Sequence, residues 1–163
     1  MKVKYFDLKN KRVFITGGGS GIGASIVEHF CEQECEVYFV DINIKESKKL
    51  ISHLKKKKIK APHFIECNLL KIKKLENIIK KIIKSKGPID ILINNAANDD
   101  RHSTKEVDEK YWNNRMDVNL KHFFFTIKAV LRGMIQKKGG AIINLSSVSW
   151  MLGEGDKVAY ETA

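Results

Sequence analysis

The segment TGGGSGIG, at residues 16–23, constrains the fold of this 163-residue chain more than any other feature. It follows the apolar run RVFIT, which predicts a buried strand, and opens the pattern IGASIVEHFCEQE, which predicts a helix. Gly17, Gly21 and Gly23 would let backbone N–H groups at the helix N-terminus approach a pyrophosphate. A purely structural turn would also use glycine, but the strand–loop–helix context favours dinucleotide binding. Four apolar residues are expected on one stripe of the helix: Ile22, Ile26, Val27 and Phe30.

The rest of the chain alternates short apolar runs with helical patterns. Further strands are expected in EVYFVD, HFIEC, DILINNAA and GGAIINLSS, and helices in KESKKLISHLKKKK and KIKKLENIIKKIIKSKG. A short helical stretch is expected around KEVDEKYW, and a long helix is expected from about Asn114 to Lys137. Five strands alternating with helices favour right-handed crossovers and a parallel sheet between helix layers. We therefore predict one α/β domain over residues 1–163, Rossmann-like and doubly wound.

The charge distribution bears on possible partners. The formal net charge is +11, but only four of the 30 basic residues are arginine. A lysine-dominated excess, such as the run Leu54–Lys60 at a helix end, indicates solvated faces rather than a nucleic-acid reader. No stretch approaches about 18 apolar residues, and the N-terminus lacks a signal-peptide core, so we expect a cytoplasmic protein without a membrane span.

The three cysteines are Cys31, Cys35 and Cys67. Their odd number in a chain of this kind indicates reduced thiols. Cys31 and Cys35 lie four residues apart on a helical pattern, without a second pair at ligand spacing. Buried small side chains are favoured over a metal site.

The second expected strand ends at Asp41, 18 residues after Gly23. A carboxylate at this position can accept hydrogen bonds from both adenosine ribose hydroxyls and would repel a 2′-phosphate. NAD is therefore favoured over NADP. The alternative is that Asp41 caps the following helix.

Several segments together resemble the classical short-chain dehydrogenase/reductase family. TGGGSGIG is similar to its cofactor loop, NNAA at Asn94–Ala97 to the motif after its fourth strand, and VNL around Asn119 to its catalytic Asn. INLSS supplies Ser147, and Tyr160 follows 13 residues later, the spacing usual in the family. The resemblance spans Val13–Tyr160. NAANDDRH and SVSWMLG further resemble bacterial NAD(P)-dependent aldose dehydrogenases of the xylose and galactose type.

The resemblance implies roles for individual residues. Tyr160 would be the general base, Ser147 would orient the substrate oxygen, and Asn119 would hold a helix irregularity and a proton-relaying water. Asn94 would tie the cofactor-bearing strand to its neighbour. At Asn68 the family usually has Asp, and an amide can still meet the edge of adenine. The cofactor-binding candidates are Gly17, Ser20, Gly21, Ile22, Gly23, Asp41, Asn68, Leu69, Asn95, Ala96 and Ala97.

The implied activity is NAD-dependent hydride transfer to or from a sugar or another secondary alcohol, with oxidation of an aldose to a lactone favoured. The family further implies a homo-oligomer, either a dimer or a tetramer. Polar residues in NDDRH are expected above the cofactor, where they could form hydrogen bonds with the hydroxyl groups of a sugar. Arg101 or His102 could instead pair with Asp99 and Asp100 in solvent.

The family's catalytic motif is Tyr-x-x-x-Lys, and the sequence given ends one residue before the Lys position. A tyrosine has a pKa of about 10, and lowering it to about 7 takes roughly 4 kcal/mol, which a nearby Lys helps to supply. The expected strand order 3-2-1-4-5 would leave the fifth strand as an open edge, without the family's last strands. The position of this end allows three interpretations. The chain is part of a longer enzyme, or it is a truncated and inactive remnant that at most binds the dinucleotide, or it is a module that a second polypeptide completes.

Overall fold

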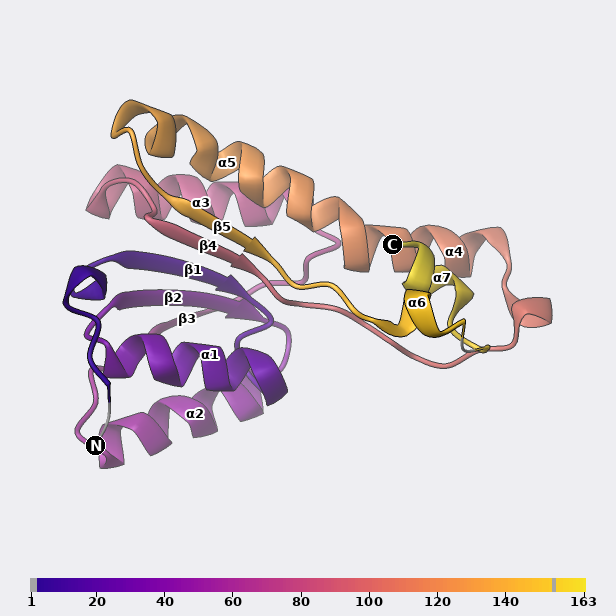
Figure 1. Ribbon diagram of the computed structural model, residues 1–163, viewed down its shortest axis with the longest axis horizontal. Helices are drawn as coiled ribbons and strands as arrows, with labels where there is room; N and C mark the ends of the chain where they lie inside the picture. The colour runs from indigo at the N-terminus through magenta and orange to yellow at the C-terminus, as the bar shows by residue number, and fades with distance from the viewer. Residues whose placement is uncertain (1–2, 154) are drawn as a thin grey trace.

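The computed structural model describes residues 3–153 and 155–163 of the chain. Its centre is a five-stranded parallel sheet in the order β3-β2-β1-β4-β5 (Figure 1). This order confirms the predicted Rossmann-like α/β architecture. The strands are β1 (Arg12–Thr16), β2 (Glu36–Asp41), β3 (His63–Glu66), β4 (Ile91–Asn94) and β5 (Ala141–Asn144).

Helices cover both faces of the sheet (Figure 1). Helices α1 and α2 lie on one face, and α3 and α5 lie on the other. The α-helices are α1 (Gly21–Glu32), α2 (Ile44–Lys56), α3 (Ile72–Lys86), α4 (Glu109–Met116), α5 (His122–Gln136), α6 (Ser149–Leu152) and α7 (Val158–Thr162). Two 3-10 helices, η1 (Phe6–Leu8) and η2 (Thr104–Glu106), and a π-helical segment, η3 (Asp117–Lys121), complete the described part of the chain.

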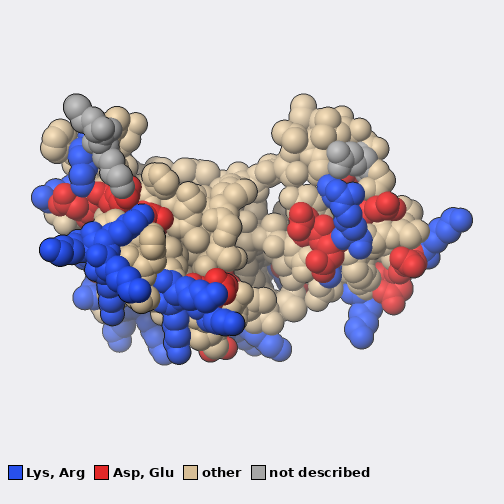
Figure 2. Space-filling model, turned by 90° about the horizontal axis from the view of Figure 1, so that it is seen from below, with Lys and Arg blue, Asp and Glu red and all other residues tan. Residues whose placement is uncertain are grey.

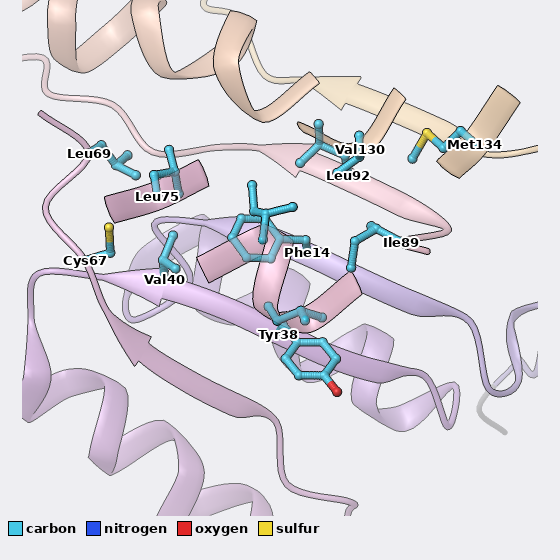
Figure 3. Packing of buried hydrophobic residues seen from close by; sticks show 12 residues of the cluster. Phe14, Tyr38, Val40, Cys67, Leu69, Leu75, Ile89, Leu92, Val130 and Met134 are labelled. Carbon is cyan, nitrogen blue, oxygen red and sulfur yellow. The ribbon is translucent and has the colours of Figure 1, made fainter. Parts of the chain in front are cut away.

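The hydrophobic core lies on both faces because neighbouring strand residues point to opposite sides of a sheet. Phe14 lies near the middle of the buried cluster under α3 and α5 (Figure 3). Its neighbours Val13 and Ile15 point to the other face and pack with buried residues of α1 and α2. Burial on both faces explains why the strands read as nearly continuous apolar runs.

The cysteines are free and buried, as predicted for Cys31, Cys35 and Cys67. The first two belong to the cluster under α1 and α2, and Cys67 belongs to the opposite cluster. Burial raises the pKa of the Cys31 thiol to about 12 and that of Cys35 to about 11. Both thiols therefore stay protonated at neutral pH and act as small core side chains.

The helical region before β5 differs from the prediction. A short helical stretch around KEVDEKYW and a long helix from about Asn114 were expected, but α4 begins at Glu109 and runs through η3 into α5, which ends at Gln136. Asp108 sets the start, because its side chain accepts the Tyr111 N–H as the N-cap of α4. The irregular part of this helical region is the π-helical segment η3, which contains Asn119.

The stripe predicted for α1 is also partly wrong. Val27 is buried and Ile26 and Phe30 are half-buried against the core, but the Ile22 side chain is 70% exposed. Ile22 lies in the first turn of α1, beside the loop that follows β1, where the sheet no longer covers the helix. The buried residues of α1 are instead Gly23, Val27 and Cys31, which follow one another at intervals of four.

A small lobe formed by α4, α6 and α7 projects beyond the carboxyl ends of the strands (Figure 1). In space-filling view the body and this lobe are joined by a narrower waist, and basic side chains crowd the surface of the body (Figure 2). The lysines of α2 and α3 are exposed, as expected for solvated helix faces. Strand β5 forms an exposed edge of the sheet, as expected.

Candidate functional site

The glycine loop, residues 17–23, is closely packed at Gly17 and Gly23 and has open space at Gly21. A Cβ atom at Gly23 would lie 1.9 Å from the carbonyl oxygen of Gly17, and one at Gly17 would lie 2.8 Å from Ala96. Gly21 has a φ of +53° and open space around it. Ser20 precedes α1 without forming a side-chain cap, so the hydroxyl and the first N–H groups of the helix face outward. This geometry suits a phosphate group at the positive end of α1.

The segment after β4 is bound to the same loop. The Asn95 amide donates hydrogen bonds to the carbonyl oxygens of Thr16 and Gly17, both at 3.0 Å. In return, the Thr16 hydroxyl oxygen accepts hydrogen bonds from the backbone N–H groups of Asn95 and Ala96, at 3.0 and 3.1 Å. Loop and segment therefore form one unit at the carboxyl edge of the sheet, where doubly wound proteins bind ligands.

Asn94 holds a different junction. Its amide nitrogen donates to Asn144 Oδ1 at 2.8 Å, and its amide oxygen accepts from the Thr126 hydroxyl at 2.7 Å. Asn94 thus ties β4 to its neighbour β5 and to α5, while Asn95 makes the contact with the glycine loop.

Asp41, at the end of β2, faces the glycine loop. One carboxylate oxygen accepts the Gly19 N–H at 2.8 Å, and the other accepts the Asn43 N–H at 2.8 Å. The N-cap of α2 is Asn43, whose side chain accepts the Glu46 N–H at 3.1 Å. The alternative that Asp41 caps α2 is therefore wrong, and its carboxylate lies beside the loop.

Asn68 and Leu69 follow β3 and differ in exposure. The Asn68 side chain is exposed and its amide oxygen accepts the Leu70 N–H at 2.9 Å. The Leu69 side chain is buried in the core cluster under α3. Asn68 can present its amide to a ligand, whereas Leu69 can contribute only backbone groups or core packing.

Three predicted catalytic residues lie around one small cavity. Asn119, Ser147 and Tyr160 line a cavity of about 130 Å³ together with Ala97. They come from η3, the loop after β5, and α7, so the tertiary structure alone brings them together. Trp150 also lines this cavity.

The polar groups of Asn119 and Ser147 already have partners. Asn119 lies in η3, accepts the Asn98 N–H at 2.7 Å and donates to the Asn98 carbonyl at 3.1 Å. The Ser147 and Ser149 hydroxyl oxygens are 2.9 Å apart, and Ser147 also accepts the Ser149 N–H at 3.2 Å. Both side chains are therefore held in one orientation at the cavity wall.

Comparison with known proteins agrees with this geometry. The sequence matches the short chain dehydrogenase family over residues 11–163. D-xylose 1-dehydrogenase of Caulobacter vibrioides is 45% identical over 159 residues, covering 98% of this chain and 62% of the relative. A Rhizobium meliloti protein named "Probable galactose dehydrogenase" is 39% identical over 157 residues, covering 96% of this chain and 61% of the relative. The chain belongs to the short-chain dehydrogenase family.

Solved structures of other dehydrogenases share the fold. Thermoplasma acidophilum aldohexose dehydrogenase superposes with a TM-score of 0.83 at 26% identity, covering 97% of this chain and 57% of that chain. A gluconate 5-dehydrogenase from Burkholderia cenocepacia, solved with NADP and tartrate, gives a TM-score of 0.82 at 27% identity, covering 94% of this chain and 60% of that chain. The present chain thus spans about 62% of the length of its D-xylose 1-dehydrogenase relative.

In this member of the family, hydrogen bonds and an ion pair hold the NDDRH segment, residues 98–102, against the lobe. The His102 Nδ1 atom lies 2.7 Å from the Tyr111 hydroxyl, and the His102 backbone N–H donates to the Asp156 carbonyl at 2.8 Å. His102 Nε2 accepts the Ala159 N–H at the start of α7, at 3.5 Å. The Asp100 carboxylate pairs with Arg115 at 3.1 Å, and the Asp100 backbone carbonyl oxygen lies 3.0 Å from His102 Nδ1.

Sequence reasoning missed Tyr111, Arg115 and His122. Tyr111 and Arg115 are four residues apart on α4, and the Arg115 guanidinium lies 4.7 Å from the Tyr111 ring centroid. The i, i+4 spacing was a usable signal for that pair. His122 follows η3 and is fully buried, which its sequence context did not indicate.

Acid is expected to destabilise the protein through His122. Burial lowers the pKa of its imidazole from 6.5 to about 4, so the folded state holds the ring neutral. The unfolded chain takes up this proton first, and stability is lost as the pH falls from 6.5 to about 4, by roughly 3 kcal/mol in total. Urea unfolding at pH 7.5 and pH 4 should show a smaller loss in His122→Gln, and equal losses would contradict the prediction.

Within residues 3–153 and 155–163, no cluster of three or more His, Cys, Asp or Glu side chains is arranged to hold a metal ion. No helix in the same ranges is both long and apolar enough to cross a membrane.

Proposed function

We propose that the protein is an NAD-dependent oxidoreductase that moves a hydride between the nicotinamide cofactor and a sugar or another secondary alcohol. Oxidation of an aldose to a lactone is the favoured reaction. The observation that carries the proposal is the cavity that collects Asn119, Ser147 and Tyr160 at the carboxyl edge of the sheet. Because the chain spans only 62% of its D-xylose 1-dehydrogenase relative, activity of the whole protein is part of the proposal.

The residues at the sheet edge fit a dinucleotide. The first N–H groups of α1, with Ser20, Gly21 and Ile22, would receive the pyrophosphate. Asp41 would accept hydrogen bonds from the adenosine ribose, and the exposed Asn68 amide would meet adenine. The segment Asn95–Ala97 would form the wall between the glycine loop and the cavity that holds Ser147 and Tyr160. The geometry at Gly21 supports this arrangement, because its φ of +53° favours glycine and no protein atom lies within 4 Å of the space a Cβ would take, which leaves room for a ligand.

The catalytic residues would handle the proton of the reaction. When bound, NAD supplies the acceptor for the hydride that leaves the alcohol carbon. As the carbon–hydrogen bond breaks, the alcohol O–H must give up its proton so that the carbonyl double bond can form. Tyr160 would take this proton as the general base, and Ser147 would hold the substrate oxygen by a hydrogen bond. Asn119 would keep η3 in place at the opposite wall.

A sugar substrate is supported by two observations. The relatives with 45% and 39% identity carry the names of a xylose and a galactose dehydrogenase. In this chain the cavity is lined by serines and by Trp150, whose side chain is 61% exposed. Hydroxyl groups suit the polar face of a sugar, and an indole ring suits its apolar face.

The experiment is an NAD reduction assay with purified protein and a panel of D-xylose, D-galactose, D-glucose and simple secondary alcohols. NADH formation with an aldose, together with lactone as the product, is the expected result. NAD binding measured by fluorescence without turnover of any alcohol would overturn the proposed activity and leave a cofactor-binding protein.

Removing the charge of Asp41 is expected to change cofactor preference. Asp41→Ser loses the carboxylate that would repel a 2′-phosphate and also loses its hydrogen bonds to the ribose. NAD affinity should fall about tenfold or more, since a charge-assisted hydrogen bond contributes roughly 1.5–3 kcal/mol, while NADP affinity should rise. The matched control is Asp41→Glu, which keeps the charge and should continue to favour NAD. A Ser variant with an unchanged ratio of NAD to NADP dissociation constants would show that Asp41 does not select the cofactor.

A further inference from the structure

His122 is a buried, titratable side chain that the proposed chemistry does not use. It begins α5 directly after η3, and its side chain is fully buried. Its Nδ1 atom lies 2.8 Å from the Val118 carbonyl oxygen of η3, and its Nε2 atom lies 3.3 Å from the Thr16 hydroxyl at the end of β1. The ring thus touches two segments that flank the proposed site and are far apart in sequence.

The proton positions in this contact follow from the partners. A carbonyl oxygen can only accept, so Nδ1 must carry a hydrogen that it donates to Val118. Burial keeps the ring neutral at pH 7, so Nε2 is bare and can only accept. The Thr16 hydroxyl is then the donor to Nε2.

The Thr16 hydroxyl is fully used in this arrangement. Its oxygen accepts the backbone N–H groups of Asn95 and Ala96, and its hydrogen points to His122. One donor and two acceptor positions are all that a hydroxyl has. The network therefore runs without a gap from η3, which carries Asn119, through His122 and Thr16 to the segment after β4.

We propose that His122 is a positioning residue that, as the Nδ1–H tautomer, holds the η3 segment of Asn119 in register with the glycine loop and Asn95–Ala97. It acts through Thr16 and does not touch a substrate. A fully satisfied buried network is rigid and has one geometry, which is the property that a site built from separate segments needs. The functional part of this inference rests on the proposed function, whereas the tautomer and the coupling to Thr16 do not.

The first experiment is nitrogen-15 NMR of the histidine rings in the whole protein at pH 7.5. A protonated Nδ1 and a bare Nε2 are expected for His122, with the Nε2 resonance shifting in Thr16→Val and returning toward its original position in Thr16→Ser. A ring with hydrogen on Nε2, or one insensitive to Thr16→Val, would overturn the proposal. This result does not depend on NAD binding or turnover, so it separates failure of this inference from failure of the proposed function.

The second experiment compares His122→Gln with His122→Asn in NAD binding by fluorescence titration. A Gln amide can reproduce the Nε2 side and accept from Thr16, whereas the shorter Asn can reproduce only the Nδ1 side. The expected result is NAD affinity within about threefold of the original in the Gln variant and about tenfold weaker in the Asn variant, because only the Asn variant loses the buried hydrogen bond to Thr16. NAD affinity close to the original in both folded variants would show that His122 only fills space, and an equal loss in both would show that the bond to Thr16 has no special part. Where the Asn variant does not fold, the nitrogen-15 NMR comparison of Thr16→Val with Thr16→Ser tests the bond between His122 and Thr16 instead, because it reads the His122 ring directly.

Discussion

Gly23→Ala is expected to distort the glycine loop, to weaken the proposed binding of NAD and to lower the free energy of unfolding by about 3 kcal/mol or more. The added Cβ would lie 1.9 Å from the Gly17 carbonyl oxygen and 2.6 Å from the Asn95 amide nitrogen. Neither atom can move freely, because the Asn95 amide is bonded to the Thr16 and Gly17 carbonyls. Overpacking a rigid site costs about 1–3 kcal/mol and more where backbone must shift. Urea unfolding and NAD binding measure the two effects.

Gly139→Ala is the matched control for Gly23→Ala. A Cβ at Gly139 meets no atom within 4 Å. Gly139 lies before β5 and away from the glycine loop, so its substitution should leave both stability and NAD binding close to the original values. A Gly23→Ala protein as stable as Gly139→Ala, with undiminished NAD binding, would show that the close packing of Gly23 on Gly17 does not shape the loop.

Tyr160→Phe is expected to lower kcat by about 100-fold or more while leaving NAD affinity unchanged. The substitution removes one hydroxyl and keeps the ring that packs at the cavity wall. General acid–base catalysis by a positioned side chain contributes roughly 10²–10⁴-fold, and the loss of the proposed proton acceptor should remove that factor. The measurement is NADH formation at saturating aldose, combined with NAD titration to confirm that the cofactor site is intact.

Tyr5→Phe is the control for the loss of a phenolic hydroxyl. Tyr5 is 57% exposed before η1 and lies outside the cavity lining. Its substitution should leave kcat unchanged. Turnover in Tyr160→Phe within a few-fold of Tyr5→Phe would remove Tyr160 from the proton-transfer step and point to another base at the cavity.

The outline of the fold could be predicted because its signals are local. RVFIT and DILINNAA read as nearly continuous apolar runs since both faces of β1 and β4 are covered, and the glycines at 17–23 mark the turn into α1. The free state of the cysteines also followed from their odd number, although Cys35 lies after the end of α1 and not on the helix that its spacing from Cys31 suggested. The family resemblance rested on motifs in a fixed order, and the match over residues 11–163 confirms it.

The errors arose where local pattern and tertiary contacts disagree. The long helix was predicted to begin at about Asn114, but α4 begins at Glu109, after the Asp108 N-cap, and continues through η3 into α5. Ile22 fitted the apolar period of α1 but lies in a first turn that the sheet does not cover. Asp41 could have capped α2, and only the structure shows that Asn43 does so. In each case periodicity describes one element and carries no information about what covers it.

The sequence by itself therefore determined the element types, a doubly wound parallel sheet, and the residue types that suit a dinucleotide loop, whereas the strand order was expected from the family resemblance. The tertiary structure decided which polar groups meet. Thr16 bonds Asn95 across 79 positions of the chain, and His122 reaches Thr16 across 106. Such contacts depend on how the strands assemble into the sheet and on the π-helical segment η3, which directly precedes the buried His122. Short-range sequence patterns cannot encode these contacts, because packing and not spacing along the chain sets the partners.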